Sequence, residues 1–403
     1  MAQPLPRLRM NLDFMPSPVE DRPGLLIRDS YGYSDAILII PPELVQCLSC
    51  FDGEQSSLDL RELLVRMTGE LDVGSLEGHL LNTLSSAGFL HDETYERMRE
   101  QKRLEFSAAE SRVASHAGSA YPDDPVAVRQ TLNQYLDGIE PPPKPANLLG
   151  IAAPHVSPFG GWQTYRSAYT ALSDEHRDRT FVILGTSHYG DPERFGLTRK
   201  PFDTPYGRAI TDIRLVDELG AQPAATMEDY CHSMEHSIEF QVLFLQHLYG
   251  PQIRILPILC GSFGSSILSG GTPEDNEAVR RFLGSLGEIA AREGDKLTWV
   301  LGIDMAHMGA RYGDDLVAIA GQNEMQDVAL RDKQRIDRVL ASDAQGFWNL
   351  VQENQDDLKW CGSSPLYTFL RAVPGAKGSL RAYDQWNIDE RSVVSFAALT
   401  FAR

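Results

Sequence analysis

Blocks of apolar and polar residues follow one another along most of the chain and predict strands and helices in turn. Short aliphatic runs predict buried strands at 148–153, 181–185, 253–260, 297–303 and 392–402. Between them, apolar residues recur at helical spacing and predict helices at 160–172, 212–219, 235–249, 275–292, 322–342 and 364–371. Strands that alternate with helices form parallel sheets covered on both faces. The pattern therefore predicts an α/β fold, a three-layer α/β/α sandwich around a mostly parallel sheet.

The amino-terminal part of the chain has a different pattern. Two apolar pieces, 24–28 and 36–40, flank a turn-rich segment and predict a β-hairpin. Helical patterns follow at 41–51, 57–67 and 75–87, the second with Ser57 as a plausible N-cap, and a charged helical stretch at 94–112 leads onward. We therefore expect a small winged-helix-like α+β domain at residues 1–105 and the α/β/α domain at residues 106–403.

Length and charge narrow the possible functions. A chain of 403 residues is too long for one ordinary core, which agrees with two domains. With 37 basic and 56 acidic residues the net charge is −19, and the predicted helix 75–87, where a winged helix would read DNA, has no Lys or Arg. Both features argue against nucleic-acid binding, because affinity for phosphates comes largely from basic side chains.

Neither a membrane span nor an export signal is predicted. No apolar run approaches the roughly 20 residues that a membrane helix needs. Arg7 and Arg9 are followed by prolines and Asp13 where a signal peptide would have its apolar region. We therefore expect a cytoplasmic protein.

Histidines follow several of the predicted strands. Pro154-His155 ends the run 148–153, Thr186-Ser-His188 ends the run 181–185, and Asp304-Met-Ala-His307 ends the run 297–303. Ligands bind at the carboxyl ends of parallel strands, which meet at one edge of the sheet. A single histidine of this kind is more often a structural residue, but their repetition favours a metal or catalytic site.

Cys361 lies just before the predicted helix 364–371, with Ser364 suited to the cap and Pro365 to the first helical position. A helix N-terminus favours the thiolate form of a cysteine, which binds metals. A buried cysteine with no chemical role is an equally good interpretation of Cys361 alone. Two imidazoles and a thiolate would leave a fourth position open on iron, copper or zinc.

A competing hypothesis comes from His232-Ser-Met-Glu235-His236, which matches the H-x-x-E-H pattern of inverted zinc metallopeptidases. That chemistry requires both histidines on one helix face. Because the predicted helix begins near Glu235, His232 would lie outside it, and we favour this hypothesis less.

Six short motifs in a fixed order resemble the Memo family, protein B of the AmmeMemoRadiSam system. They are Ala114-Ser-His-Ala-Gly-Ser-Ala-Tyr121, Ala153-Pro-His155, Phe181-Val-Ile-Leu-Gly-Thr-Ser-His188, Glu235-His-Ser-Ile-Glu239, Asp304-Met-Ala-His307 and Cys361-Gly362. The resemblance runs from about residue 112 to the end. Memo proteins are similar in fold to class III extradiol dioxygenases. Separately, the segment 47–90 resembles PqqD-like peptide-binding domains.

The Memo resemblance implies a mononuclear iron or copper centre, with zinc possible, and a redox enzyme of unknown substrate. Its metal ligands would be His155, His188 and Cys361. The same resemblance implies an acid/base role for His307, oriented by Asp304, with Glu235 and His236 lining the cleft. A radical SAM protein and an AMMECR-type protein would be the partners. The alternative is a non-catalytic component of that assembly, which binds a peptide or partner through the amino-terminal domain.

Two departures from the family pattern bear on the substrate. Val156-Ser-Pro-Phe159 follows His155 where the family usually has Ala-Gly-Tyr, so the pocket should differ in shape. Cys361 stands where the dioxygenases use a carboxylate. Because a thiolate is softer and more easily oxidised, it favours copper or iron in a redox role over cleavage of a catechol ring.

Overall fold

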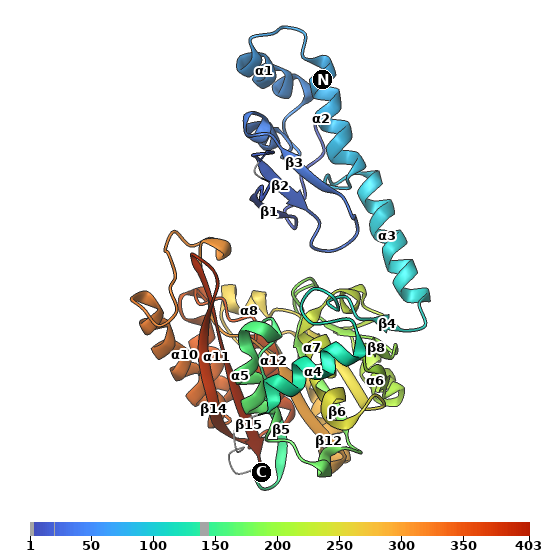
Figure 1. Ribbon diagram of the computed structural model, residues 1–403, viewed down its shortest axis with the longest axis vertical. Helices are drawn as coiled ribbons and strands as arrows, with labels where there is room; N and C mark the ends of the chain where they lie inside the picture. The colour runs from blue at the N-terminus through green and yellow to red at the C-terminus, as the bar shows by residue number, and fades with distance from the viewer. Residues whose placement is uncertain (1–3, 20, 138–144) are drawn as a thin grey trace. The chain divides into compact units, whose positions relative to one another are not determined.

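The computed structural model describes residues 4–19, 21–137 and 145–403. The chain divides into two compact units, Met1–Ala108 and Ala109–Arg403 (Figure 1). The predicted domain boundary, at residues 105 and 106, falls in the last turn of helix α3 (Glu93–Ala108), which belongs to the first unit.

The amino-terminal unit combines a small sheet with helices. Strands β1 (Asp13–Pro16), β2 (Leu25–Arg28) and β3 (Ile37–Ile40) form an antiparallel sheet in that order, which confirms the predicted hairpin. They are followed by a 3-10 helix η1 (Pro42–Cys50) and by α1 (Ser57–Thr68), α2 (Gly74–Ser86) and α3. Strand β1 was not predicted, because its four residues Asp-Phe-Met-Pro show no clear alternation. The sheet and helices share one apolar core.

The carboxyl-terminal unit is organised around a large sheet. Its centre consists of four parallel strands in the order β5 (Leu148–Ala153), β12 (Leu297–Gly302), β6 (Thr180–Thr186) and β11 (Arg254–Cys260). Strand β15 (Ser392–Ala402) pairs antiparallel with β5 and carries β14 (Lys377–Asp389) and β13 (His307–Gly309) as neighbours. Beyond β11 lie shorter strands: β7 (Phe195–Leu197), β8 (Phe202–Thr204), β9 (Gly207–Thr211), β10 (Ala225–Met227) and β4 (Arg112–Val113). The predicted mostly parallel α/β sheet is thus confirmed.

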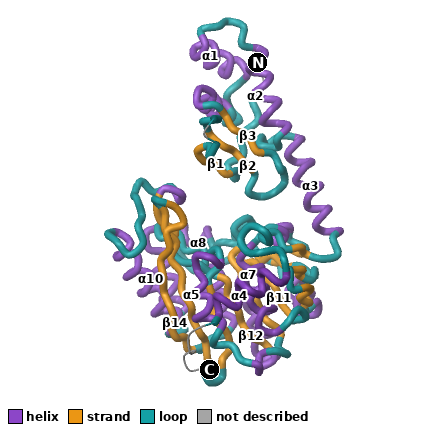
Figure 2. Tube along the Cα trace, in the orientation of Figure 1, coloured by secondary structure: helices purple, strands orange, loops and turns teal. Residues whose placement is uncertain are grey.

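Helices cover both faces of this sheet (Figure 2). On one face, α4 (Pro125–Leu136), α5 (Pro158–Tyr169) and α7 (His236–Tyr249) pack against alternate strand residues such as Phe181 and Ile183. The opposite face packs Val182 and Leu184 against a second set of helices, α6 (Ile213–Gly220), α9 (Glu277–Glu293), α10 (Glu324–Leu340), α11 (Ala344–Gln352) and α12 (Ser363–Ala372). A short helix, α8 (Gly264–Ser269), packs beside α11. Alternation along each strand therefore separates two cores, as three layers require.

Two larger elements were not predicted. Within the described part of the chain, strand β14 pairs with β15 alone and is half-exposed along its length, so its mixed polar sequence lacks the apolar run of a buried strand. Helix α11 has only nine residues and carries Gly346 in its first turn, which lowers its helix propensity, although its buried residues recur at helical spacing. Among the described residues, no helix combines the length and apolar character needed to cross a membrane.

Candidate metal centre

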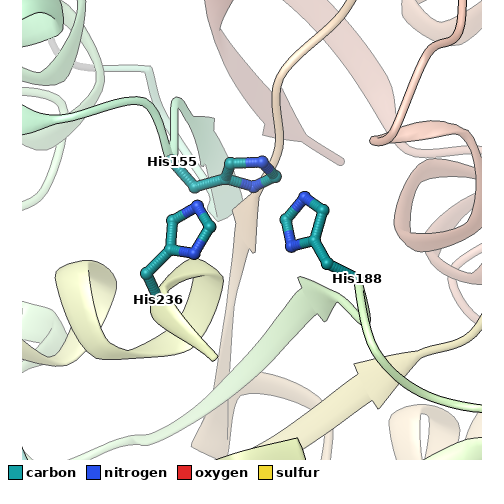
Figure 3. A group of neighbouring side chains, drawn as sticks. All are labelled: His155, His188 and His236. Carbon is teal, nitrogen blue, oxygen red and sulfur yellow. The ribbon is translucent and has the colours of Figure 1, made fainter. Parts of the chain in front are cut away.

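Three imidazoles converge at the carboxyl edge of the parallel sheet. His155 follows β5, His188 follows β6, and His236 is the first residue of α7. Their rings point toward one another (Figure 3), and one nitrogen from each lies within 4.8 Å of the others. The ring centroids of His155 lie 5.0 Å from His188 and 5.2 Å from His236. The described residues therefore contain a group of donors close enough to hold one metal ion.

Helix α7 can approach this edge closely because β12 ends in Gly302 and β6 contains Gly185 near its end. A Cβ on Gly302 would lie 2.1 Å from the carbonyl oxygen of Ser237, and one on Gly185 would lie 2.5 Å from the Ser237 hydroxyl. That hydroxyl donates to the carbonyl of Thr186 at 2.8 Å. Without these close contacts the first turn of α7, and His236 with it, would lie farther from the strand ends.

Hydrogen bonds to Nδ1 orient two of the imidazoles. His155 Nδ1 lies 2.9 Å from the carbonyl oxygen of Gly302, which can only accept, so Nδ1 carries the proton. His188 Nδ1 lies 3.0 Å from the carboxylate of Glu235. A proton on Nδ1 leaves the lone pair on Nε2, and a carboxylate or carbonyl behind Nδ1 is the usual support of a metal-binding histidine.

Glu235 caps helix α7 and joins it to the strand end. Its carboxylate accepts the backbone N–H groups of His188 at 2.9 Å, His236 at 2.9 Å and Ser237 at 3.2 Å. Burial alone would raise the pKa of Glu235, but His188 and these donors hold it well below its usual range. Burial likewise opposes a charge on His188, yet Glu235 raises the pKa of that imidazole well above its usual value. The two side chains form an ion pair when no metal is bound.

Cys361 lies beside this group, at the start of α12. Its Sγ is 3.3 Å from His155 Nε2 and 3.6 Å from the carbonyl oxygen of Asp304. Although burial opposes the thiolate, His155 and His188 lower the pKa of Cys361 to about 7. The structure thus places Cys361 next to His155 and His188. The donors that lie within 4.8 Å of one another are His155, His188 and His236, and sequence had assigned His236 to the cleft lining.

Asp304 and His307 lie on the Cys361 side of the cluster. Asp304 accepts the backbone N–H of His155 at 3.0 Å, and burial raises the pKa of its carboxyl to about 6. Asp304 does not accept from His307 Nδ1, which donates to the carbonyls of Met305 at 2.8 Å and Lys359 at 3.1 Å, so the orienting role of Asp304 stays a prediction. Burial lowers the pKa of His307, although Asp304 opposes this, and donation from Nδ1 leaves the lone pair on Nε2.

The H-x-x-E-H pattern does not form one helix face. His232 lies in a 3-10 turn, Tyr230–Ser233, and Glu235 is the cap of α7 rather than part of its body. His232 is buried, and its Nε2 donates to the carbonyl of Gly196 at 3.0 Å. The arrangement that a zinc peptidase needs from these residues is therefore not present.

A buried ion pair behind the cluster was not assigned a role from the sequence. Glu239 is fully buried, pairs with Arg112, and accepts the backbone N–H of His116 at 3.0 Å. The ring of His116 then lies 5.4 Å from that of His236. Glu239 follows Glu235 by one helical turn, so its place on the same helix face could have been read from the motif that contains both. No sequence pattern marks Arg112.

Comparison with known proteins shows which proteins the chain resembles and over which residues. Residues 112–400 match a protein family described as Memo-like protein. A MEMO1 family protein of Aquifex aeolicus (strain VF5) is 27% identical over 387 residues, covering 93% of this chain and 95% of the relative. Another, of Desulfurococcus amylolyticus, is 27% identical over 302 residues, covering 71% of this chain and 96% of the relative. The Aquifex match is too long for the carboxyl-terminal unit alone and includes part of both units.

Among solved structures, an uncharacterized protein of Escherichia coli K12, JW3007, is 13% identical with a TM-score of 0.35, covering 58% of this chain and 88% of that one.

Proposed function

Because the chain belongs to the Memo-like protein family, we propose that it is a metal-dependent redox enzyme whose ion is held by His155, His188 and Cys361. One observation carries the proposal. Two imidazoles with hydrogen-bonded Nδ1 atoms and a thiol within 3.3 Å of one of them meet at the edge of the sheet where ligands bind. The donors come from segments up to 206 residues apart, which packing alone does not require.

The donor set fits iron or copper. Imidazole nitrogen binds both, and the soft sulfur favours copper(I) and iron, although zinc accepts the same ligands. Carboxylate and carbonyl groups behind the two imidazoles complete the outer shell. The site is also open on one side: the side chains of His188 and His236 are each 27% exposed, against 1% for His155. A substrate would approach from that side.

The protein's own groups handle protons around the ion. Iron or copper would supply the exchange of electrons between substrate and oxidant. His307, neutral and with Nε2 free to accept, is suited to take a proton from a substrate hydroxyl or thiol. Burial lowers the pKa of His236 well below its usual value, although Glu235 opposes this. The ring is therefore uncharged, and a ring nitrogen can offer its lone pair on the open side of the site. It would serve as a further ligand or as a substrate contact.

Metal analysis tests this proposal. Protein purified without oxygen should contain iron or copper, up to about one ion per chain. The variant His155→Ala/His188→Ala should lose almost all of it, because two of the nitrogen donors are gone. The control is His79→Ala, which removes an exposed imidazole of the amino-terminal unit. Equal metal content in wild type and double variant, with both folded by circular dichroism, would exclude the assignment.

We further propose that the amino-terminal unit binds a peptide or protein partner, in an assembly with a radical SAM protein and an AMMECR-type protein. Its separate apolar core supports an independent role. The match to the Aquifex relative extends into this unit, so a unit of this kind accompanies the carboxyl-terminal unit in that protein too.

A further inference from the structure

The loop before Cys361 has an unfavourable backbone. Asn354, Gln355, Asp356 and Lys359 all have φ between +52° and +56°, in the left-handed region that residues with a Cβ rarely adopt. Four such residues within six positions persist only where the surrounding contacts hold them, and strain of this kind clusters at functional sites.

This loop positions both the Cys361 thiol and the His307 imidazole. Cys361 stands at its end, and the backbone N–H of Gly362 donates to the carbonyl of Asp304 at 3.0 Å. The carbonyl of Lys359 accepts from His307 Nδ1 at 3.1 Å, and that of Leu358 accepts from the His307 backbone at 2.9 Å. The path of residues 358–362 therefore determines where the thiol lies and which nitrogen of His307 carries the proton.

Two buried residues of helix α10 hold the loop through Trp360. Asp332 is fully buried, and its Oδ1 accepts the indole N–H of Trp360 at 2.6 Å. One turn later Arg335, 2% exposed, pairs with Asp356 at 2.6 Å and lies 5.3 Å from the centre of the Trp360 ring. Asp356 in turn accepts the backbone N–H of Trp360 at 3.1 Å. Contacts at Asp356 and Trp360 therefore hold the strained segment in place.

The second carboxyl oxygen of Asp332 is linked to the segment that carries His307. It accepts the hydroxyls of Ser395 at 2.6 Å and Tyr383 at 2.7 Å. The Ser395 oxygen accepts the backbone N–H of Ala306, next to His307, at 2.8 Å. One buried carboxylate therefore joins the segment that carries Cys361 to the segment that carries His307.

We propose that Asp332 and Trp360 are positioning residues, which hold the strained 354–361 loop so that the Cys361 thiol faces the metal-binding imidazoles and His307 presents Nε2. This inference rests on the proposed function, in which Cys361 is a ligand. Packing alone would require neither a buried carboxylate nor a hydrogen-bonded indole here, because an apolar pair of the same shape would fill the space.

Cobalt(II) affinity provides the test, measured by chelator competition on the full chain without oxygen. Trp360→Phe keeps an aromatic ring and removes the N–H donor, and Asp332→Asn keeps the shape but replaces one of the two accepting oxygens with an amide that cannot accept. We expect each to weaken cobalt binding by about five- to tenfold, the effect of one lost hydrogen bond. The near-ultraviolet absorption of a thiolate bound to cobalt should weaken as well.

Two comparisons separate positioning from general damage. In a Cys361→Ser background the same substitutions should change cobalt affinity by less than about twofold, because the group through which they act is gone. Trp348→Phe is the matched control: Trp348 is a fully buried tryptophan of the same core, and its indole N–H has no partner among the described residues. It should leave cobalt binding unchanged.

The cobalt-binding results distinguish a positioning role from its failure and from a failure of the proposed ligand set. Unchanged affinity in Trp360→Phe and Asp332→Asn overturns the inference, as does an equal loss in Trp348→Phe or in the Cys361→Ser background. If Cys361→Ser alone leaves cobalt affinity and absorption unchanged, Cys361 is not a ligand. That outcome removes the thiolate from the proposed function and overturns the positioning role with it.

Discussion

At the scale of single residues, the site depends on which atoms carry protons. The carboxylate of Glu235 and the carbonyl of Gly302 place the protons of His188 and His155 on Nδ1. Cys361 differs from the other four cysteines, which are buried: as a residue it is intermediate in exposure, and its Sγ lies 3.3 Å from His155 Nε2. The neighbouring His155 and His188, rather than exposure, lower the pKa of this thiol, because burial acts in the opposite direction.

The acidity of Cys361 predicts a pH dependence. In metal-free protein the rate of alkylation by iodoacetamide should rise through a midpoint near pH 7, because the thiolate is the reactive form and the pKa is lowered to about 7. His155→Ala should move the midpoint up toward about 8.5, the value of an ordinary thiol. Cys361→Ala supplies the blank, since the other thiols are buried. A wild-type midpoint above 8 would contradict the assigned environment. Metal affinity should fall below the same midpoint, where protons compete for sulfur.

At the scale of elements, the site forms where the first turn of α7 packs against the ends of β6 and β12. Ser237 and Gln241 make the contact, and Gln241 Nε2 donates to the carbonyl of Pro154, directly before His155, at 2.8 Å. The helix is therefore joined to three strand ends at once. A glycine at 302 permits this approach, because any side chain there would meet the backbone of α7.

Gly302→Ala tests the importance of that contact. The added methyl group would lie 2.1 Å from the carbonyl oxygen of Ser237, so α7 must shift, and overpacking of this kind costs about 1–3 kcal/mol. We expect a lower urea midpoint and weaker metal binding. Gly284→Ala in α9 is the control, since its methyl group would meet nothing within 4 Å and should stabilise the helix slightly. Equal midpoints for Gly302→Ala and wild type would show that the helix does not pack this closely.

At the scale of the whole molecule, the chain is two units with separate cores. Every residue of the candidate site belongs to the carboxyl-terminal unit, whose two main cores lie on the two faces of the sheet. The amino-terminal unit contributes none of them. This division predicts that metal binding and partner binding can be separated.

Expression of the units alone tests that division. Residues 109–403 should fold and keep the metal content of the full chain, because all donors and their hydrogen-bond partners lie within them. Residues 1–108 should bind no metal but should capture a partner in a pull-down with the radical SAM protein. Loss of metal from residues 109–403, despite a native circular dichroism spectrum, would show that the site needs the amino-terminal unit.

Local pattern was enough to predict much of this architecture. Apolar runs in the sequence predicted the central strands. His155 and His188 could be placed at strand ends because the end of an apolar run is visible in the local sequence. Helix α12 and the place of Cys361 just before it were also predicted, but the cap was not: the helix begins at Ser363 after Gly362, so Ser364 and Pro365 lie within its first turn. Half-exposed β14 was missed because its mixed sequence has no apolar run, and α11 was missed because it has only nine residues, although its buried residues recur at helical spacing.

The remaining features depend on contacts between residues far apart in the chain. His236 joins the cluster because α7 packs on two glycines of other elements, and the tautomer of His307 depends on a carbonyl 52 residues away. Asp332 meets Trp360 only when α10 covers the sheet. The sequence alone determined which donors this protein has and at which strand ends they stand. Tertiary structure decided which of them meet and which nitrogen each imidazole presents, because hydrogen bonding and close approach in space cannot be read from spacing along the chain.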